Sequence, residues 1–148
     1  MKKIRIVFVD AALIKNDTIL LQKRSKGAFK DDWTLVGEAV EAGESLEEAM
    51  RVMVKKQTGL ELTEVHMLGI YDDPDRNPEV SSVSVAFLCS VKGTPKDTTM
   101  QFFAFNELPE NIGFDHTKII GDAIRFHKLL QNPFGIASII PGKKKQAS

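Results

Sequence analysis

The sequence contains little of what marks secreted, membrane and nucleic-acid-binding proteins. Its 148 residues include one cysteine, and 20 basic residues balance 20 acidic ones. Balanced charge predicts no polyanion-binding surface. The N-terminal apolar stretch is interrupted by Arg5 and Asp10, and no small-residue cleavage site follows it. We therefore expect one cytoplasmic domain that uses neither nucleic acid nor a membrane as a partner.

The lone cysteine, Cys89, falls within a run of alternating apolar residues from Val83 to Val91. Alternation of this kind is typical of a strand with a buried face, where a free cysteine behaves as a small hydrophobe. We therefore predict a packing role for Cys89 rather than a catalytic thiol.

Apolar periodicity divides the chain into strands and two helices. It predicts helices over 46–58 and 116–131. It predicts strands at about 3–14, 18–24, 33–40, 62–71, 82–91 and 99–105. This order defines an α+β chain with a mixed sheet. We expect one domain over residues 1–131 and a C-terminal tail at 132–148.

Two connections carry turn chemistry. The segment "KNDT" (15–18) predicts a hairpin turn, because Asn and Asp tolerate the backbone of tight turns. The segment "DDPDRNPEVSS" (72–82) has two prolines and several Asp and Ser residues, which predict a long exposed loop. Long loops in compact domains are often functional, so this loop is a candidate for ligand recognition.

The first helix has clear end signals. Ser45 and Glu48 have the spacing of a capping box, and Gly59 supplies a left-handed stop. At 100° per residue its apolar side chains share one face. The members of that face are Leu46, Ala49, Met50, Met53 and Val54. From spacing alone this is an ordinary amphipathic helix.

The stretch Gly37 to Leu60, "GEAVEAGESLEEAMRVMVKKQTGL", resembles the box of the Nudix hydrolase superfamily, G-x5-E-x7-R-E-U-x-E-E-x-G-U, where U is aliphatic. The preceding "WTLVGE" (33–38) resembles the family's W-x-L-P-G-G. The frame fits without a gap, and at its defining positions stand Glu38, Glu44, Val52, Met53, Val54, Lys56, Gln57, Gly59 and Leu60. Glu44 is the only intact acidic residue of the box, which is therefore degenerate. The resemblance implies a Nudix fold, an α/β/α sandwich with a central mixed sheet.

Later segments resemble the ADP-ribose pyrophosphatase branch of this superfamily. They are "GIYDDPDRNP" (69–78), "VSVAFL" (83–88) and "FNELPENIGFDHTKII" (105–120). The resemblance implies a ligand in which a nucleoside diphosphate is linked to a sugar or similar group. It also places Tyr71 and Arg76 at the nucleotide, and the Arg24 of "LLQKRS" (20–25) near the substrate. The family often forms homodimers, which we carry over as an expectation.

The chemistry of the box explains why its substitutions matter. Attack of water on a diphosphate needs divalent cations, and Mg²⁺ or Mn²⁺ prefers carboxylate oxygens. The family supplies these oxygens mainly from positions that hold Met53, Lys56 and Gln57 here. Loss of most of such a cage is expected to cost several orders of magnitude in rate. We therefore expect weak or lost hydrolase activity.

Three alternatives remain open for the site. In the first, hydrolysis persists: Glu38 and Glu44, with Glu41, hold one Mg²⁺ or Mn²⁺, Glu44 is catalytic, and a distal base comes from Asp97, Glu107 or Glu110. In the second, the chain binds without cutting. Its candidate ligand-binding residues are Arg24, Lys56, Gln57, Tyr71 and Arg76, with no cofactor.

In the third alternative, Met53 fills the former metal cavity, Lys56 points to water, and the fold serves as a non-catalytic structural or interaction subunit. Nudix-like transcription regulators of the same branch carry a winged-helix extension of many tens of residues. Nothing of that kind is present here, so we do not expect DNA binding.

Aromatic and acid-base residues outside the box are interpreted as structural. Trp33 matches a family position that is largely packing. Asp115 is a candidate N-cap for the second helix, and His116 lies in its first turn. His127 falls on the apolar face of that helix, while His66 is isolated in a strand. The three histidines show no metal-ligand spacing.

Overall fold

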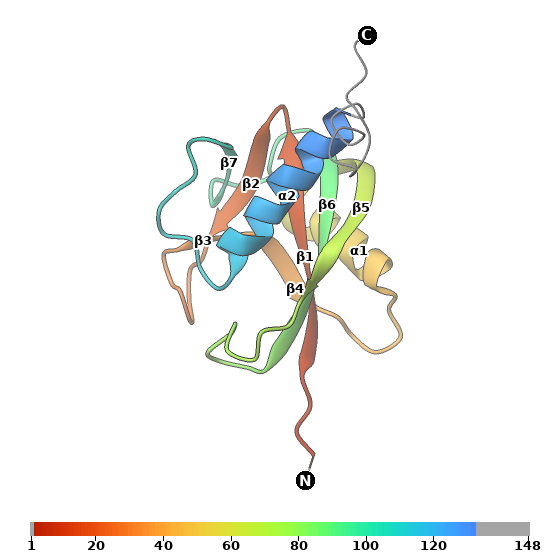
Figure 1. Cartoon of the computed structure of the whole chain (residues 1–148), viewed down its shortest axis with the longest axis vertical. Helices are drawn as coiled ribbons and strands as arrows, with labels where there is room; N and C mark the ends of the chain where they lie inside the picture. Colours follow the sequence, from red (N-terminus) through yellow and green to blue (C-terminus); the bar gives the residue numbers. More distant parts are fainter. Residues whose placement is uncertain (1, 133–148) are drawn as a thin grey trace, which may run out of the picture.

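The computed structural model describes residues 2–132 and shows an α+β sandwich (Figure 1). The predicted tail lies outside the described residues, apart from Asn132. The two helices are α1 (Leu46–Thr58) and α2 (His116–Gln131). The strands are β1 (Ile6–Lys15), β2 (Thr18–Lys23), β3 (Trp33–Thr34), β4 (Val36–Ala39), β5 (Glu61–Tyr71), β6 (Ser82–Lys92) and β7 (Met100–Ala104).

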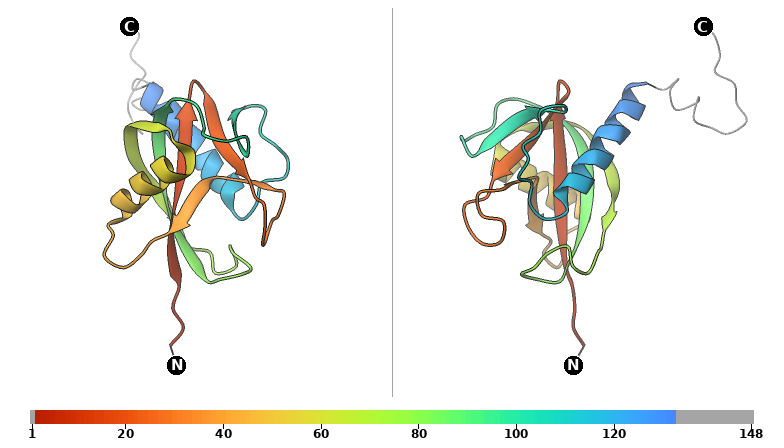
Figure 2. Two further views of the ribbon diagram at one scale, coloured as in Figure 1. Left: turned by 180° about the vertical axis from the view of Figure 1, so that it is seen from behind. Right: turned by 60° about the vertical axis from the view of Figure 1, so that its left-hand side comes forward.

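The sheet is mixed and its centre is β1. The strand order is β3-β2-β1-β6-β5, while β4 pairs with β1 and β7 pairs with β2. The β1–β6 pair is parallel and the other ladders are antiparallel. The helices cover opposite faces of this sheet, as the two views of Figure 2 show. The predicted sandwich with a central mixed sheet is therefore confirmed.

Strand β1 is buried on both faces, which makes it the middle layer of two cores. Val9, Ala11 and Leu13 pack into the core beneath α1. Ala12 and Ile14 pack into the core beneath α2. Because side chains alternate along a strand, Asp10 points to the α2 side. A carboxylate is thereby placed inside the protein, where the buried polar residues Ser84 and His116 also lie.

The residues predicted as one strand at 33–40 form two strands instead. β3 pairs with β2, whereas β4 pairs with the first half of β1, so the chain changes partners at Leu35. The Leu35 backbone N–H donates to His116 Nδ1 at 3.0 Å rather than to a strand. The sequence-based prediction was wrong here because the interruption depends on a side chain 81 residues away.

Local signals explain the ends of the first helix and the hairpin. Ser45 Oγ accepts the N–H of Glu48, and Gly59 adopts a left-handed φ of 74°. Asn16 and Asp17 have φ of 51° and 57°, as a tight turn of two left-handed residues requires. The predicted N-cap, C-terminal stop and hairpin turn are all confirmed.

The start of α2 differs from the prediction. Asp115 occupies the N-cap position, yet its side chain makes no capping hydrogen bond. Both carboxylate oxygens accept instead from Arg76. An ionic partner with two parallel donors outcompetes a single backbone N–H for the carboxylate.

Gly37 of β4 generates a stability prediction, because it lies opposite Asp10 of β1. A Cβ at Gly37 would lie 2.1 Å from Asp10 Oδ1 and 2.9 Å from the Val9 carbonyl oxygen. We expect Gly37→Ala to lower the free energy of unfolding by about 1–3 kcal/mol in urea titrations.

Gly69→Ala is the matched control, because a Cβ there would make only ordinary contacts, the nearest at 3.8 Å with Tyr71. Its unfolding free energy should stay within about 1 kcal/mol of the wild-type value. Equal losses in the two variants would contradict the close packing of Gly37 on Asp10.

Candidate functional site

Two cavities adjoin at the N-terminal end of α2. The larger measures about 630 Å³, and its apolar walls include Phe29, Ile70 and Phe114. The smaller measures about 100 Å³ and has Asp10 and His116 in its lining. Arg76 and Phe114 line both cavities. Together we call them the α2 cleft.

Divergence of two strands from β1 leaves room for the smaller cavity. β4 pairs with β1 from Phe8 to Ala11, whereas β2 pairs with β1 only at Ile14 and Lys15. The side chain of Gln22 from β2 and the backbone of Gly37 from β4 therefore lie on the cavity lining with Asp10 of β1.

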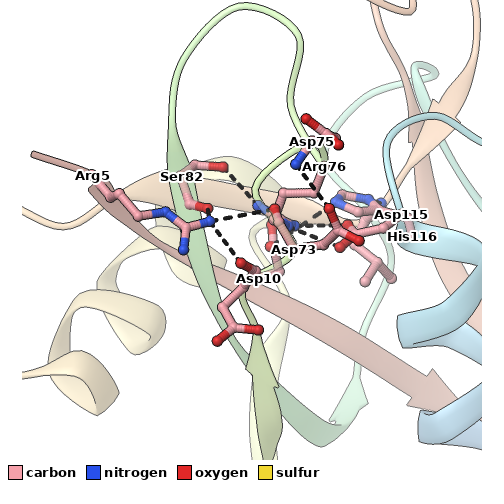
Figure 3. A network of polar contacts seen from close by, with 10 residues as sticks. Arg5, Asp10, Asp73, Asp75, Arg76, Ser82, Asp115 and His116 are labelled. Atoms are coloured by element: carbon pink, nitrogen blue, oxygen red, sulfur yellow. Dashed lines mark hydrogen bonds and ion pairs between the residues drawn. The ribbon is translucent and has the colours of Figure 1, made fainter. Parts of the chain in front are cut away.

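Arg76 joins the 72–82 loop to α2 (Figure 3). Its Nε and Nη2 donate to the two Asp115 carboxylate oxygens at 2.8 and 2.7 Å, and its Nη1 donates to Ser82 Oγ at 2.8 Å. The Arg76 side chain is 4% exposed. Burial and bidentate geometry make this pair a rigid wall between the two cavities.

A second arginine fastens the ends of the same loop. Arg5 Nη2 donates to the carbonyl oxygens of Asp72 and Ser82 at 2.8 and 2.7 Å. It also reaches the Asp73 carbonyl oxygen at 3.3 Å. One side chain thus binds the backbone at the first and last residues of the predicted loop.

Arg24 lies on the lining of the smaller cavity, as expected for a ligand-binding candidate. Its Nε donates to the Ala28 carbonyl oxygen at 2.7 Å. Its guanidinium carbon lies 4.8 Å from the ring centroid of Phe114. Its Nη2 also donates to the Lys26 carbonyl oxygen, at 3.4 Å. Stacking and these two hydrogen bonds orient the cation and leave its remaining N–H donors for a bound anion.

Tyr71 lines the larger cavity but is engaged by α2. Its hydroxyl donates to Asp122 Oδ2 at 2.7 Å, and Lys118 Nζ lies 5.8 Å from its ring centroid. Burial, and then the hydrogen bond to Asp122, raise the pKa of Tyr71 well above its ordinary value. The phenol is therefore neutral, and its hydroxyl proton is engaged by Asp122.

The polar groups of the box are engaged within the protein. Lys56 Nζ lies 3.2 Å from Glu38 Oε1, and Gln57 Nε2 donates to the Gly37 carbonyl oxygen at 3.0 Å. Glu44 Oε1 accepts the N–H of Glu41 at 3.0 Å. The contacts of Lys56 and Gln57 join α1 to β4, and the contact of Glu44 lies within the loop that connects them.

The box residues do not fit a Nudix metal cage. Met53 is fully buried in the core beneath α1, and an ammonium and an amide stand where carboxylates are needed. Throughout residues 2–132, no group of three or more His, Cys, Asp or Glu side chains is arranged to hold a metal ion. Glu38, a predicted metal ligand, has the Lys56 ammonium beside it instead.

The structure brings only some of the predicted site residues together. Arg24, Tyr71 and Arg76 line the α2 cleft, whereas Lys56 is on the lining of neither cavity. Gln57 adjoins the smaller cavity through the Gly37 carbonyl. Of the distal base candidates, Asp97 binds the N–H and hydroxyl of Thr99, which lowers its pKa.

Packing roles are confirmed for Cys89 and Trp33. Cys89 is 1% exposed, and burial raises the pKa of its thiol to about 12. Trp33 packs edge-on against Phe103. His127 is mostly buried, lies edge-on to Phe105 and has Nε2 3.5 Å from Asp17 Oδ1. None of these side chains reaches the α2 cleft.

Sequence reasoning missed Asp10 as a site residue. It treated Asp10 only as an interruption of an apolar run, although a lone charge on a strand buried on both faces is itself a signal. The Arg76–Asp115 pair was also missed, because nothing in the sequence joins residues 39 positions apart.

Comparisons with known proteins agree with this architecture. The NUDIX domain family model matches residues 5–122, and the chain therefore belongs to the Nudix family. It is 38% identical over 136 residues to an ADP-ribose pyrophosphatase of Methanocaldococcus jannaschii, covering 85% of this chain and 80% of that protein. As a class, Nudix hydrolases use divalent metals such as Mg or Mn.

Solved structures show the same fold at lower identity. A MutT/nudix family protein from Enterococcus faecalis is 20% identical, with a TM-score of 0.73 over 88% of this chain and 64% of its own. The NUDIX domain of Shewanella oneidensis NrtR, solved with ADP ribose, is 20% identical, with a TM-score of 0.71 over 85% of this chain and 90% of its own. Among the described residues, no helix is long and apolar enough to cross a membrane.

The buried Arg76–Asp115 pair generates a second stability prediction. Asp115→Ala would leave the Arg76 guanidinium buried without its counter-ion, so we expect a loss of roughly 3 kcal/mol in the free energy of unfolding. Urea denaturation followed by circular dichroism measures this loss.

Glu47→Ala is the control, because it removes the exposed partner of Arg51, in a pair whose side chains are 57% and 49% exposed. That substitution should change the unfolding free energy by less than about 1 kcal/mol. A similarly small effect of Asp115→Ala would show that Arg76 does not depend on its counter-ion.

Proposed function

We propose that the protein binds a nucleoside diphosphate joined to a sugar, of the ADP-ribose type, in the α2 cleft and hydrolyses it weakly or not at all. The ligand class is supported by the 38% identity to an ADP-ribose pyrophosphatase. The observation that carries the loss of hydrolysis is the Lys56 ammonium, 3.2 Å from Glu38 at the box.

Charge places the diphosphate near the boundary of the two cavities. The larger cavity is lined by four carboxylates, Asp72, Asp73, Asp75 and Asp115, against Arg76 and Lys118. The smaller cavity has one carboxylate on its lining, that of Asp10, with Arg24 and the Asp115-paired Arg76. An anion gains more from the second setting, so the phosphates lie beside the two arginines.

The walls of the larger cavity suit a nucleobase. Phe29, Phe114 and Pro78 supply apolar surface, and the ring of Tyr71 is held by Asp122. Among the charged groups of this cavity, these aromatic and apolar side chains offer a surface on which a planar base can stack. The base therefore lies in the larger cavity.

The polar groups of the box helix are paired with neighbouring residues. Lys56 compensates the charge of Glu38, and Gln57 satisfies the carbonyl of Gly37, whose backbone lines the smaller cavity. No divalent cation is required for either contact. We therefore expect the ligand to bind without a metal, in contrast to the chemistry expected of an intact box.

Hydrolysis of the same ligand is the second candidate, and the similarity to an ADP-ribose pyrophosphatase favours it. It would rely on Glu44, the acidic residue of the box that remains. The other alternative, an interaction subunit without a ligand, has no specific contact in its favour.

The test is calorimetric titration with ADP-ribose, without and then with Mg²⁺, followed by assay of the same samples for AMP. We expect binding without metal, little change on adding Mg²⁺, and no AMP formed in proportion to protein. AMP production that is lost in Glu44→Gln would overturn the non-catalytic proposal.

Two variants test the placement of the phosphates. Arg24→Gln should weaken binding by roughly 10- to 100-fold, because a charged hydrogen bond is removed. Lys26→Gln, an exposed cation of the same loop, should leave affinity within about threefold of the wild-type value. Equal effects would remove Arg24 from the site.

A further inference from the structure

Asp10 is a buried carboxylate with one unsatisfied oxygen. Its side chain is 7% exposed, and Oδ2 has no hydrogen-bond partner among the described residues. The other oxygen, Oδ1, lies over Gly37. Buried polar atoms in proteins almost always have partners. Because Asp10 lines the smaller cavity, a group that enters this space can supply the missing donor.

His116 is the second polar group of this cavity, and a hydrogen bond holds its ring in place. Its Nδ1 accepts the Leu35 N–H at 3.0 Å, so the ring proton of the neutral imidazole is on Nε2. Burial lowers the pKa of His116, which favours that neutral form, although Asp10 and Asp115 oppose the shift. His116 therefore presents an N–H donor.

The donor and the acceptor face each other without bonding. His116 Nε2 lies 3.9 Å from Asp10 Oδ2, beyond the usual hydrogen-bond distance. The cavity volume of about 100 Å³ is enough for several water molecules or a small polar group. The floor is buried, while Arg24, Asn77 and Phe114 at the rim are partly exposed.

A hydroxyl group matches this pair better than other ligand groups do. A hydroxyl donates one proton and accepts through its lone pairs, so it can bond Asp10 and His116 together. A phosphate oxygen only accepts, and the Asp10 carboxylate would repel it. The adjacent Arg24 and Arg76 cations suit a phosphate on the same molecule.

We propose that Asp10, with His116, is the specificity-determining residue for a sugar hydroxyl next to the ligand's phosphate. The inference rests on the proposed function, because it assigns the sugar of that ligand to the smaller cavity. The Asp10 Oδ2 atom accepts the hydroxyl proton, and His116 Nε2–H donates to the hydroxyl oxygen. Ligands without a hydroxyl at this position gain neither contact.

The test compares D-ribose 5-phosphate with propyl phosphate, which carries the phosphate without hydroxyls. Wild-type protein should bind ribose 5-phosphate roughly 10-fold or more tightly than propyl phosphate, as measured by calorimetry. Asp10→Asn keeps the side-chain shape and should reduce this preference to about threefold or less. Glu61→Gln, at an exposed carboxylate that does not line the cavity, should retain the preference.

A second measurement does not depend on the variant's folding. Ribose 5-phosphate should shift the imidazole resonances of His116 in wild-type protein, whereas propyl phosphate should not. Equal affinity for the two probes, unchanged His116 resonances, or full preference in a folded Asp10→Asn variant would overturn the inference.

The outcomes separate this inference from the proposed function. Failure of ADP-ribose to bind wild-type protein would refute the proposed function alone. Selectivity for ribose 5-phosphate that depends on Asp10 would still support the hydroxyl site. Conversely, ADP-ribose binding that is unaffected by Asp10→Asn, together with equal binding of the two probes, would refute only the hydroxyl site.

Discussion

Asp10 is the constraint around which the cleft is arranged. β1 is buried on both faces, so its one charged central residue must be accommodated inside the protein. Gly37 provides the space above one carboxylate oxygen, since any Cβ there would collide with it. His116 faces the other oxygen from the start of α2. The strand pairing, the choice of glycine and the position of α2 are thus linked at one side chain.

The wall of the cleft depends on a second buried charge. Arg76 comes from a loop and would be costly to bury alone, but Asp115 and Ser82 satisfy three of its N–H groups. Asp115 makes no capping hydrogen bond at the start of α2, because both of its carboxylate oxygens bond Arg76. Since Arg76 lines both cavities, the same contacts that hold the loop also fix a cation where a phosphate can meet it.

Periodicity and end signals predicted much of the fold, because these are local properties. The helix expected over 46–58 is observed with those bounds, and its face of apolar residues is the buried one. The break at Leu35 could not be predicted, since it depends on a hydrogen bond to His116 across 81 residues. The same limit applies to the site. Arg24, Tyr71 and Arg76, which line the cleft, were proposed from the resemblance. Asp10 became a candidate only once the structure showed it on the lining of the smaller cavity.

In our proposal the box helix has exchanged metal binding for pairing through Lys56 and Gln57. The most direct measurement is electron paramagnetic resonance of Mn²⁺ titrated with the protein, first alone and then with saturating ADP-ribose. We expect the signal of free Mn²⁺ to stay unchanged when protein is in excess over metal. Stoichiometric loss of that signal, with recovery in Glu44→Gln, would contradict it.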